Sequence, residues 1–268
     1  MAYGDLKYSL RMAYRRHPAI SALVAVNVGV AVICWITGFV ALAAGKNLHP
    51  GMWLSVPSSG VIMRPWTVLT FMFTQTNVFH LLFNMLWLYW FGIVLADAGG
   101  DRKVVRGYVA GGIAGAVAFI IFAGFAPSLS ASSLSGASAS VVAIMVESAL
   151  KRPDMRFRLL LIGTVRLKWL ALMSLLLLLL GFGGGNAGGQ AAHIGGVVSG
   201  LALWLIDTGR IPLPKHEKRR KADRIIKVME SRRQGMERLD ELLDKIKVSG
   251  YDSLTKQEKR ELDRLSSR

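Results

Sequence analysis

Residues 78–96, VFHLLFNMLWLYWFGIVLA, form an apolar run in which only His80 and Asn84 carry strongly polar side chains. A helix needs about 20 apolar residues to cross a bilayer, so the run predicts a membrane-spanning segment. His80 and Asn84 are four residues apart and therefore project from one face of that helix. Because polar groups inside a span are costly, this face is a candidate functional site.

Five further apolar runs are bounded by charges, glycine or proline. With 78–96 they predict an all-α, polytopic membrane protein, in keeping with a hydrophobic content of 52%. The fourth of the six helices has only 13 residues, which predicts a helix that starts below the membrane surface and is reached by an irregular, shielded segment. The five runs are about Ile20 to Ala44, Val104 to Phe125, Ser138 to Leu150, Leu167 to Leu180 and Ala191 to Ile206.

The distribution of basic residues distinguishes the two ends of the predicted bundle. The net charge of +16 suggests nucleic acid, but 18 of the 33 Lys and Arg lie in the last 59 residues and most others flank apolar runs. This is the positive-inside pattern of membrane proteins, so we expect no nucleic-acid partner. The N-terminus, the second and fourth connections and the tail are basic, which predicts that both termini are cytoplasmic.

The composition divides the chain into three parts. We expect a cytoplasmic N-terminal segment (1–16), a six-helix membrane domain (17–209) and a basic cytosolic helical tail (210–268). In the tail, Ile225 to Val248 alternates charged and apolar residues at helical spacing, and residues 249–253 break the pattern before a short charged helix. The basic stretch 215–224 is expected to lie against anionic lipid headgroups, and no partner is predicted for the tail.

Small residues recur four apart in two of the predicted helices. Gly111 and Gly115 lie in the third, and Gly196 and Gly200 in the sixth. Such spacing permits close approach of helices, so tight packing is the main expectation for these glycines.

The polar residues of three helices converge. The second, fourth and sixth helices all run inward, and each has its polar residues near its start: His80 and Asn84, Ser138, and His193. Ser138 follows Gly136 at a helix N-terminus, where free amides and the helix dipole favour negative charge. His193 is suited to act as a general base, and His80 with Asn84 to donate hydrogen bonds to an oxyanion. These are the parts that acyl transfer needs.

Each of these residues also has a structural explanation. Ser138 can be a helix cap, His193 a packing residue, and His80 with Asn84 interhelical hydrogen-bonding groups. The four residues are predicted to lie on the same side of the membrane and at similar depth, and this agreement favours a hydrolase. The outer half has no Asp or Glu, which predicts a Ser–His dyad without a carboxylate. A metal site from His80 and His193 lacks a third strong ligand, so we expect neither metal nor cofactor.

Three ordered motifs resemble those of the rhomboid intramembrane proteases, over about residues 17–208. Residues 64–92 contain the family's HxxxN element at His80 and Asn84. SGASAS (135–140) resembles the GxSx nucleophile motif, and AHIGGVVSG (192–200) the sixth-helix motif with its histidine. Residues 239–266 resemble a short cytosolic module appended to similar bacterial proteins.

The resemblance implies a role for each site residue. Ser138 is the nucleophile, His193 the base, and the Ser138 amide with the His80 and Asn84 side chains forms the oxyanion hole. Gly136 and Ala139 support the nucleophile motif. Two positions depart from the family pattern: many relatives have glycine at Ala139, and many have a tyrosine stacked on the histidine at Val142.

The resemblance also implies a function. It predicts a serine endopeptidase of the bacterial inner membrane that cuts transmembrane protein substrates in or next to their spans, with the active site opening to the extracytoplasmic side. The first outer loop would lie partly in the outer leaflet, anchored by Arg64 and Trp66, with a gate at Leu175 to Leu180 and a cap at Gly181 to Gly189.

Two other functions remain open at this point. One is a proteolytically inactive rhomboid-like protein that binds client helices. The other is a transporter or channel, which would need a polar path through the whole membrane and is disfavoured because polarity is confined to the outer half.

Overall fold

The computed structural model describes residues 16–126, 132–159, 163–180, 187–211, 236, 238–247 and 249–266. The chain divides into two compact units, Met1–Arg210 and Ile211–Arg268, and each is described by itself.

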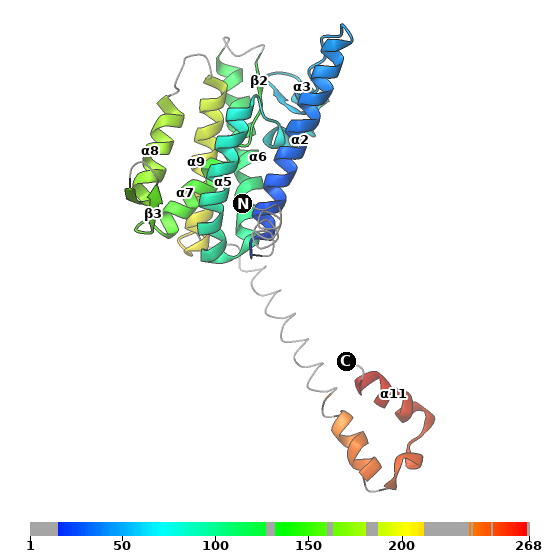
Figure 1. Ribbon diagram of the computed structural model, residues 1–268. Helices are drawn as coiled ribbons and strands as arrows, with labels where there is room; N and C mark the ends of the chain where they lie inside the picture. Colours follow the sequence, from blue (N-terminus) through cyan, green and yellow to red (C-terminus); the bar gives the residue numbers. More distant parts are fainter. Residues whose placement is uncertain are drawn as a thin grey trace, which may run out of the picture. The chain divides into compact units, whose positions relative to one another are not determined.

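The described residues of the first unit form a bundle with six helices of 14 residues or more, drawn side by side in Figure 1. Each helix lies within a few residues of a predicted one, so the all-α, polytopic fold is confirmed. The helices are α2 (Pro18–Ala43), α5 (Val78–Gly99), α6 (Asp101–Phe125), α7 (Ser138–Lys151), α8 (Leu167–Leu180) and α9 (Ala187–Asp207).

Helix length separates two groups within the bundle. By length and composition, α2, α5, α6 and α9 are able to cross a membrane. Helices α7 and α8 have 14 residues each, which is about 21 Å of helix against a hydrocarbon core of about 30 Å. Most of α7 is buried among its neighbours, as a short fourth helix requires.

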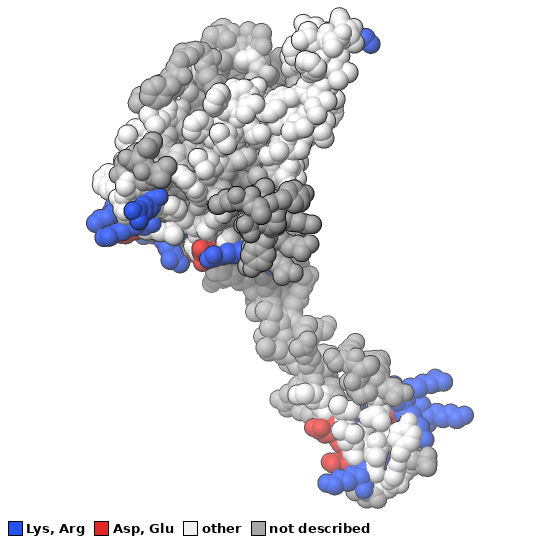
Figure 2. Space-filling view, in the orientation of Figure 1, with Lys and Arg blue, Asp and Glu red and all other residues white. Residues whose placement is uncertain are grey.

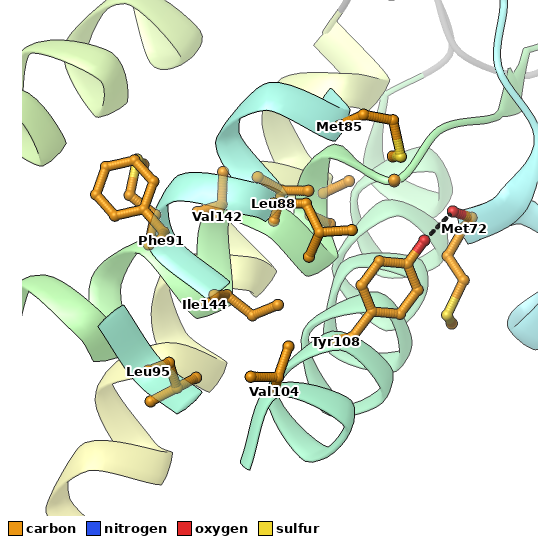
Figure 3. Packing of buried hydrophobic residues seen from close by; sticks show 14 of the residues in the cluster. Met72, Met85, Leu88, Phe91, Leu95, Val104, Tyr108, Val142 and Ile144 are labelled. Carbon is orange, nitrogen blue, oxygen red and sulfur yellow. Dashed lines mark hydrogen bonds between the residues drawn. The ribbon is translucent and has the colours of Figure 1, made fainter. Parts of the chain in front are cut away.

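The core of the bundle combines apolar packing with glycine contacts. Figure 3 shows side chains of α5, α6 and α7 interlocked, among them Leu88, Tyr108 and Ile144. A Cβ at Gly111 would lie 2.5 Å from the Ala143 Cβ, so α6 and α7 touch there almost backbone to backbone. Glycines of α9 make similar contacts with α6 and α7, which confirms the expected close packing.

The connection between α2 and α5, which the sequence predicted to lie outside the membrane, is folded rather than irregular. It holds short elements that fix the approach to α5, and one of its strands pairs antiparallel with the segment that precedes α7. The apolar side chains of Ile62 and Met63 are more than four-fifths exposed, as suits a loop in contact with lipid. The elements are α3 (Gly51–Leu54), β1 (Val56–Pro57), η1 (Val61–Met63), α4 (Thr67–Thr70) and η2 (Phe71–Phe73), with β2 (Ser133–Leu134) as the partner of β1.

A β-hairpin joins α7 to α8, formed by β3 (Arg156–Leu159) and β4 (Gly163–Arg166). From the sequence, this segment was interpreted only as a basic connection. Residues 156–159 alternate arginine with apolar side chains, but four residues are the shortest pattern by which a strand is recognised, and residues 163–166 show no such alternation. The hairpin was therefore not predicted from the sequence pattern.

A cluster of charges ties α6, α7 and α9 together at the end of the bundle away from Ser138. Glu147, which is fully buried, accepts hydrogen bonds from Arg106 at 3.0 Å and Lys151 at 2.6 Å. Asp207 of α9 bonds to the same two cations, at 2.8 and 2.5 Å, and pairs with Lys103 at 2.6 Å. Every carboxylate in this cluster thus meets at least two cations.

Glu147→Gln is expected to lower the free energy of unfolding by about 2 kcal/mol, because the amide cannot supply charge-assisted bonds to Arg106 and Lys151. Unfolding in detergent micelles measures the change. The matched control is Asp97→Asn in the same unit, where the carboxylate is exposed and the expected change is under about 0.5 kcal/mol. Equal effects of the two substitutions would contradict the argument.

The second unit contains a helical stretch over 238–247, η4 (Tyr251–Ser253) and α11 (Lys256–Ser266). Thr255 and Glu258 form a reciprocal cap at the start of α11, with bonds of 2.7 and 3.3 Å. Lys245, bonded to Glu258 at 2.8 Å, together with Thr255 holds the pKa of that carboxyl at about 2. The predicted break and final helix are confirmed; the basic stretch 215–224 and the start of the preceding helix lie outside the described residues.

Candidate active site

Ser138 is the first residue of α7, and Gly136 prepares its position. Gly136 has a φ of 121°, a conformation that side chains disfavour, and its N–H donates to the Phe71 carbonyl at 3.0 Å. A Cβ there would also collide with the imidazole of His80. Backbone geometry and crowding both require glycine two residues before the serine.

The hydroxyl of Ser138 meets the imidazole of His193. The Ser138 Oγ and the His193 Nε2 are 2.9 Å apart, although the residues belong to different helices, α7 and α9. His193 is buried, whereas Ser138 is half-buried. The two side chains are therefore within hydrogen-bond distance of each other inside an apolar bundle, and the serine remains partly exposed.

The second nitrogen of the imidazole, His193 Nδ1, is buried and has no hydrogen-bond partner among the described residues. The backbone of Leu178 on α8 lies beside the imidazole, so packing against both α8 and α9 orients the ring. Val142, the position at which the family resemblance implied a tyrosine, faces α9 one turn inward: a Cβ at Gly196 would lie 3.2 Å from the Val142 Cβ.

His80 and Asn84 occupy successive turns of α5. The His80 ring lies against Gly136, and its Nδ1 is 3.1 Å from the Thr76 hydroxyl. Asn84 is buried, and its Nδ2 donates to Gln75 Oε1 at 3.1 Å. His80 therefore lies directly beside the turn that precedes Ser138, and Asn84 lies one turn further along α5 with one N–H engaged.

A chain of buried polar side chains continues from Asn84 across the bundle. Gln75 donates to Asn27 Oδ1 at 2.9 Å, and Asn27 donates to the Tyr108 hydroxyl at 2.8 Å. Tyr108 in turn donates to the Met72 carbonyl at 2.7 Å, the dashed line in Figure 3. Of this chain of side chains, only Asn84 was predicted from the sequence to be functional. Asn27, a strongly polar residue within the first apolar run, is the feature of the sequence that could have indicated the rest.

Gln75→Leu is expected to lower the free energy of unfolding by about 2 kcal/mol, because it leaves Asn27 Oδ1 and one Asn84 N–H buried without partners. The double variant Asn27→Leu, Gln75→Leu removes both members of one bond and should cost less than the sum of the single changes. A double-mutant cycle of unfolding measurements tests this. Additive losses would show that the two side chains do not support each other.

A cavity of about 450 Å³ borders the site on the side of the connection between α2 and α5. Two of its lining residues, Thr76 and Gln75, are those that contact His80 and Asn84. Further polar groups line the cavity, so it has both the volume and the hydrogen-bonding groups that water molecules need. They include Cys34, His49, Ser133 and Ser135.

Among the described residues, no group of three or more His, Cys, Asp or Glu side chains lies close enough to hold a metal ion.

The structure is that of an all-α membrane bundle in which the serine at the start of α7 contacts a histidine in the second turn of α9. Residues 63–210 match the rhomboid domain family, and since the match covers more than half of the chain, the protein belongs to that family. Residues 227–268 match a second family, DUF6576, described as a family of unknown function. Among the curated proteins compared with the chain, none matches.

Proposed function

We propose that the protein is an intramembrane serine endopeptidase that hydrolyses peptide bonds in or next to the transmembrane segments of other membrane proteins. Members of the rhomboid family are generally serine proteases that act within the bilayer on such substrates. The observation that carries the proposal for this chain is the 2.9 Å contact between Ser138 Oγ and His193 Nε2. A nucleophile and its base need this distance.

The proposed reaction begins with attack of Ser138 Oγ on the scissile carbonyl carbon. His193 Nε2 accepts the hydroxyl proton and then delivers it to the leaving amine, which breaks the peptide bond and leaves an acyl ester on Ser138. Water, deprotonated by His193, hydrolyses the ester and restores the serine. The cavity beside Thr76 and Gln75 supports this step because it holds room for water next to the site.

The negative charge that develops on the carbonyl oxygen requires donors. The backbone N–H of Ser138, at the N-terminus of α7, supplies one and adds the positive end of the helix dipole. The His80 ring against Gly136 and the second N–H of Asn84 are the proposed side-chain donors. The bond from Asn84 Nδ2 to Gln75 uses one of the two N–H groups and restricts rotation of the amide.

A substrate helix hides its carbonyls behind its own hydrogen bonds. It must unwind locally to reach Ser138, which favours small or helix-breaking residues near the cut. Helix α8 is the proposed gate, since it is short and exposes Leu172, Leu176 and Leu177 as a lipid-facing surface. Most of the proposed cap at 181–189 lies outside the described residues.

The proposed orientation places Ser138 toward the extracytoplasmic side of a bacterial inner membrane, with both termini in the cytoplasm. Figure 2 shows the Lys and Arg side chains of the first unit gathered mainly at one end, the end at which Figure 1 labels β3. The positive-inside rule assigns that end to the cytoplasm.

The test uses full-length protein reconstituted with a single-span model substrate that has a glycine-rich segment near the outer end of its helix. Cleavage within or beside that span, with a fluorophosphonate probe attached to Ser138 in a mass-spectrometric digest, is the expected result. Intact substrate together with no probe labelling would favour an inactive protein that binds client helices.

A further inference from the structure

The β3–β4 hairpin has two different faces. Arg156 pairs directly with Arg166 across the strands, and Arg158 pairs with Thr164. Side chains of paired residues, and of residues two apart, share one face of a sheet, so all three arginines project together. Phe157 projects from the opposite face and packs against the hydrophobic core of the bundle.

The arginine face is short of negative charge. Arg156 and Arg166 are like charges directly opposite each other, an arrangement that destabilises a strand pair by itself. The carboxylate of Asp154 forms ion pairs with both Lys168, at 2.9 Å, and Arg166, at 3.6 Å. Among the described residues, neither Arg156 nor Arg158 has a carboxylate partner, and both are exposed.

The hairpin is held close to the membrane boundary. It follows α7 after four residues and runs directly into α8, whose first N–H donates to the Met155 carbonyl at 2.7 Å. Trp169, on the first turn of α8, is 55% exposed, as is common for tryptophan at the level of lipid headgroups. Groups on the arginine face are therefore within reach of the headgroups of one leaflet.

We propose that the arginine face, Arg156, Arg158 and Arg166, binds the phosphate of an anionic phospholipid in the leaflet at this end of the bundle. Guanidinium groups bind phosphate in bidentate fashion, and a phosphate between Arg156 and Arg166 removes their mutual repulsion. Lipid is favoured over nucleic acid or an acidic protein because the hairpin connects two membrane helices without a spacer. The proposal does not depend on proteolysis.

The test measures which lipids the purified full-length protein retains. Wild type is mixed with equal amounts of phosphatidylglycerol and phosphatidylcholine with the same acyl chains, and bound lipid is counted by native mass spectrometry. Wild type is expected to retain phosphatidylglycerol preferentially. Each basic residue near an anionic surface strengthens attraction by about fivefold, so the triple Arg→Gln variant at 156, 158 and 166 should lose at least about tenfold of that preference.

The matched control makes the same change of charge in the second unit, at Lys247, Lys256 and Arg260, and should behave as wild type. A triple Arg→Lys variant of the hairpin keeps the charge, which protects folding, but loses the bidentate geometry and should lose about threefold. Equal retention of the two lipids by wild type would overturn the proposal. So would full retention by either hairpin variant, or an equal loss in the control.

Discussion

Ser138→Ala is expected to lower the rate of substrate cleavage by at least about 10⁴-fold, because it removes the only atom proposed to attack the carbonyl. The change deletes a single half-buried hydroxyl, so folding should be unaffected. Initial rates of cleavage of the single-span substrate in vesicles, with protein amounts matched, measure the loss. Probe labelling should disappear in the same variant.

Ser140→Ala is the matched control two residues further along α7. The Ser140 hydroxyl is fully buried and has no hydrogen-bond partner among the described residues, so its removal should leave stability unchanged or slightly raised. Its cleavage rate should stay within about twofold of wild type. A loss in Ser140→Ala as large as that in Ser138→Ala would mean that serine deletion harms the fold rather than the chemistry.

The histidine completes the test of the pair. Since Ser138 and His193 are proposed to act as one unit, the double variant Ser138→Ala, His193→Ala should be no slower than Ser138→Ala alone. Multiplied losses in the double variant would show that the two residues act separately.

The parts of the fold that the sequence predicted are those encoded locally. Six apolar runs gave six helices because burial of backbone polar groups in lipid leaves a helix few alternatives. The start of α9 differs: it begins at Ala187, four residues before the predicted Ala191. Gly188 and Gly189 disfavour a helix by propensity, but both are buried, so tertiary packing outweighs the local preference.

The contacts that the sequence did not predict join distant segments. Gln75 and Asn27 are 48 residues apart, and nothing near either residue indicates the other. The pairing of Arg156 with Arg166 could not be predicted for a different reason. Like charges opposite each other disfavour a strand pair, and the packing of Phe157 on the core, which favours the hairpin, cannot be read from the sequence. The serine–histidine contact was easier to expect, since Ser138 begins α7 and His193 lies in the second turn of α9, near the same end of the predicted bundle.

Gly195→Ala is expected to have the largest effect of any single added methyl group in the bundle. A Cβ at this position of α9 would overlap the Ala114 carbonyl oxygen and lie 2.7 Å from the Ala114 carbonyl carbon and 2.9 Å from the Gly115 Cα. All three are backbone atoms, which cannot rotate away as a side chain does. Helices α6 and α9 must separate, at a cost of about 3 kcal/mol in the free energy of unfolding.

The same substitution should also slow cleavage, because Gly195 lies two residues after His193 and any shift of α9 moves the imidazole from Ser138. A displacement of about 1 Å in a reacting pair costs about 10²-fold in rate. Gly124→Ala on α6 is the control: a Cβ there meets nothing within 4 Å, so it should leave the rate unchanged and raise stability by about 0.5 kcal/mol. Unfolding and cleavage measured on both variants separate the two effects. Gly195→Ala with wild-type stability and rate would mean that α6 and α9 are not in backbone contact beside the site.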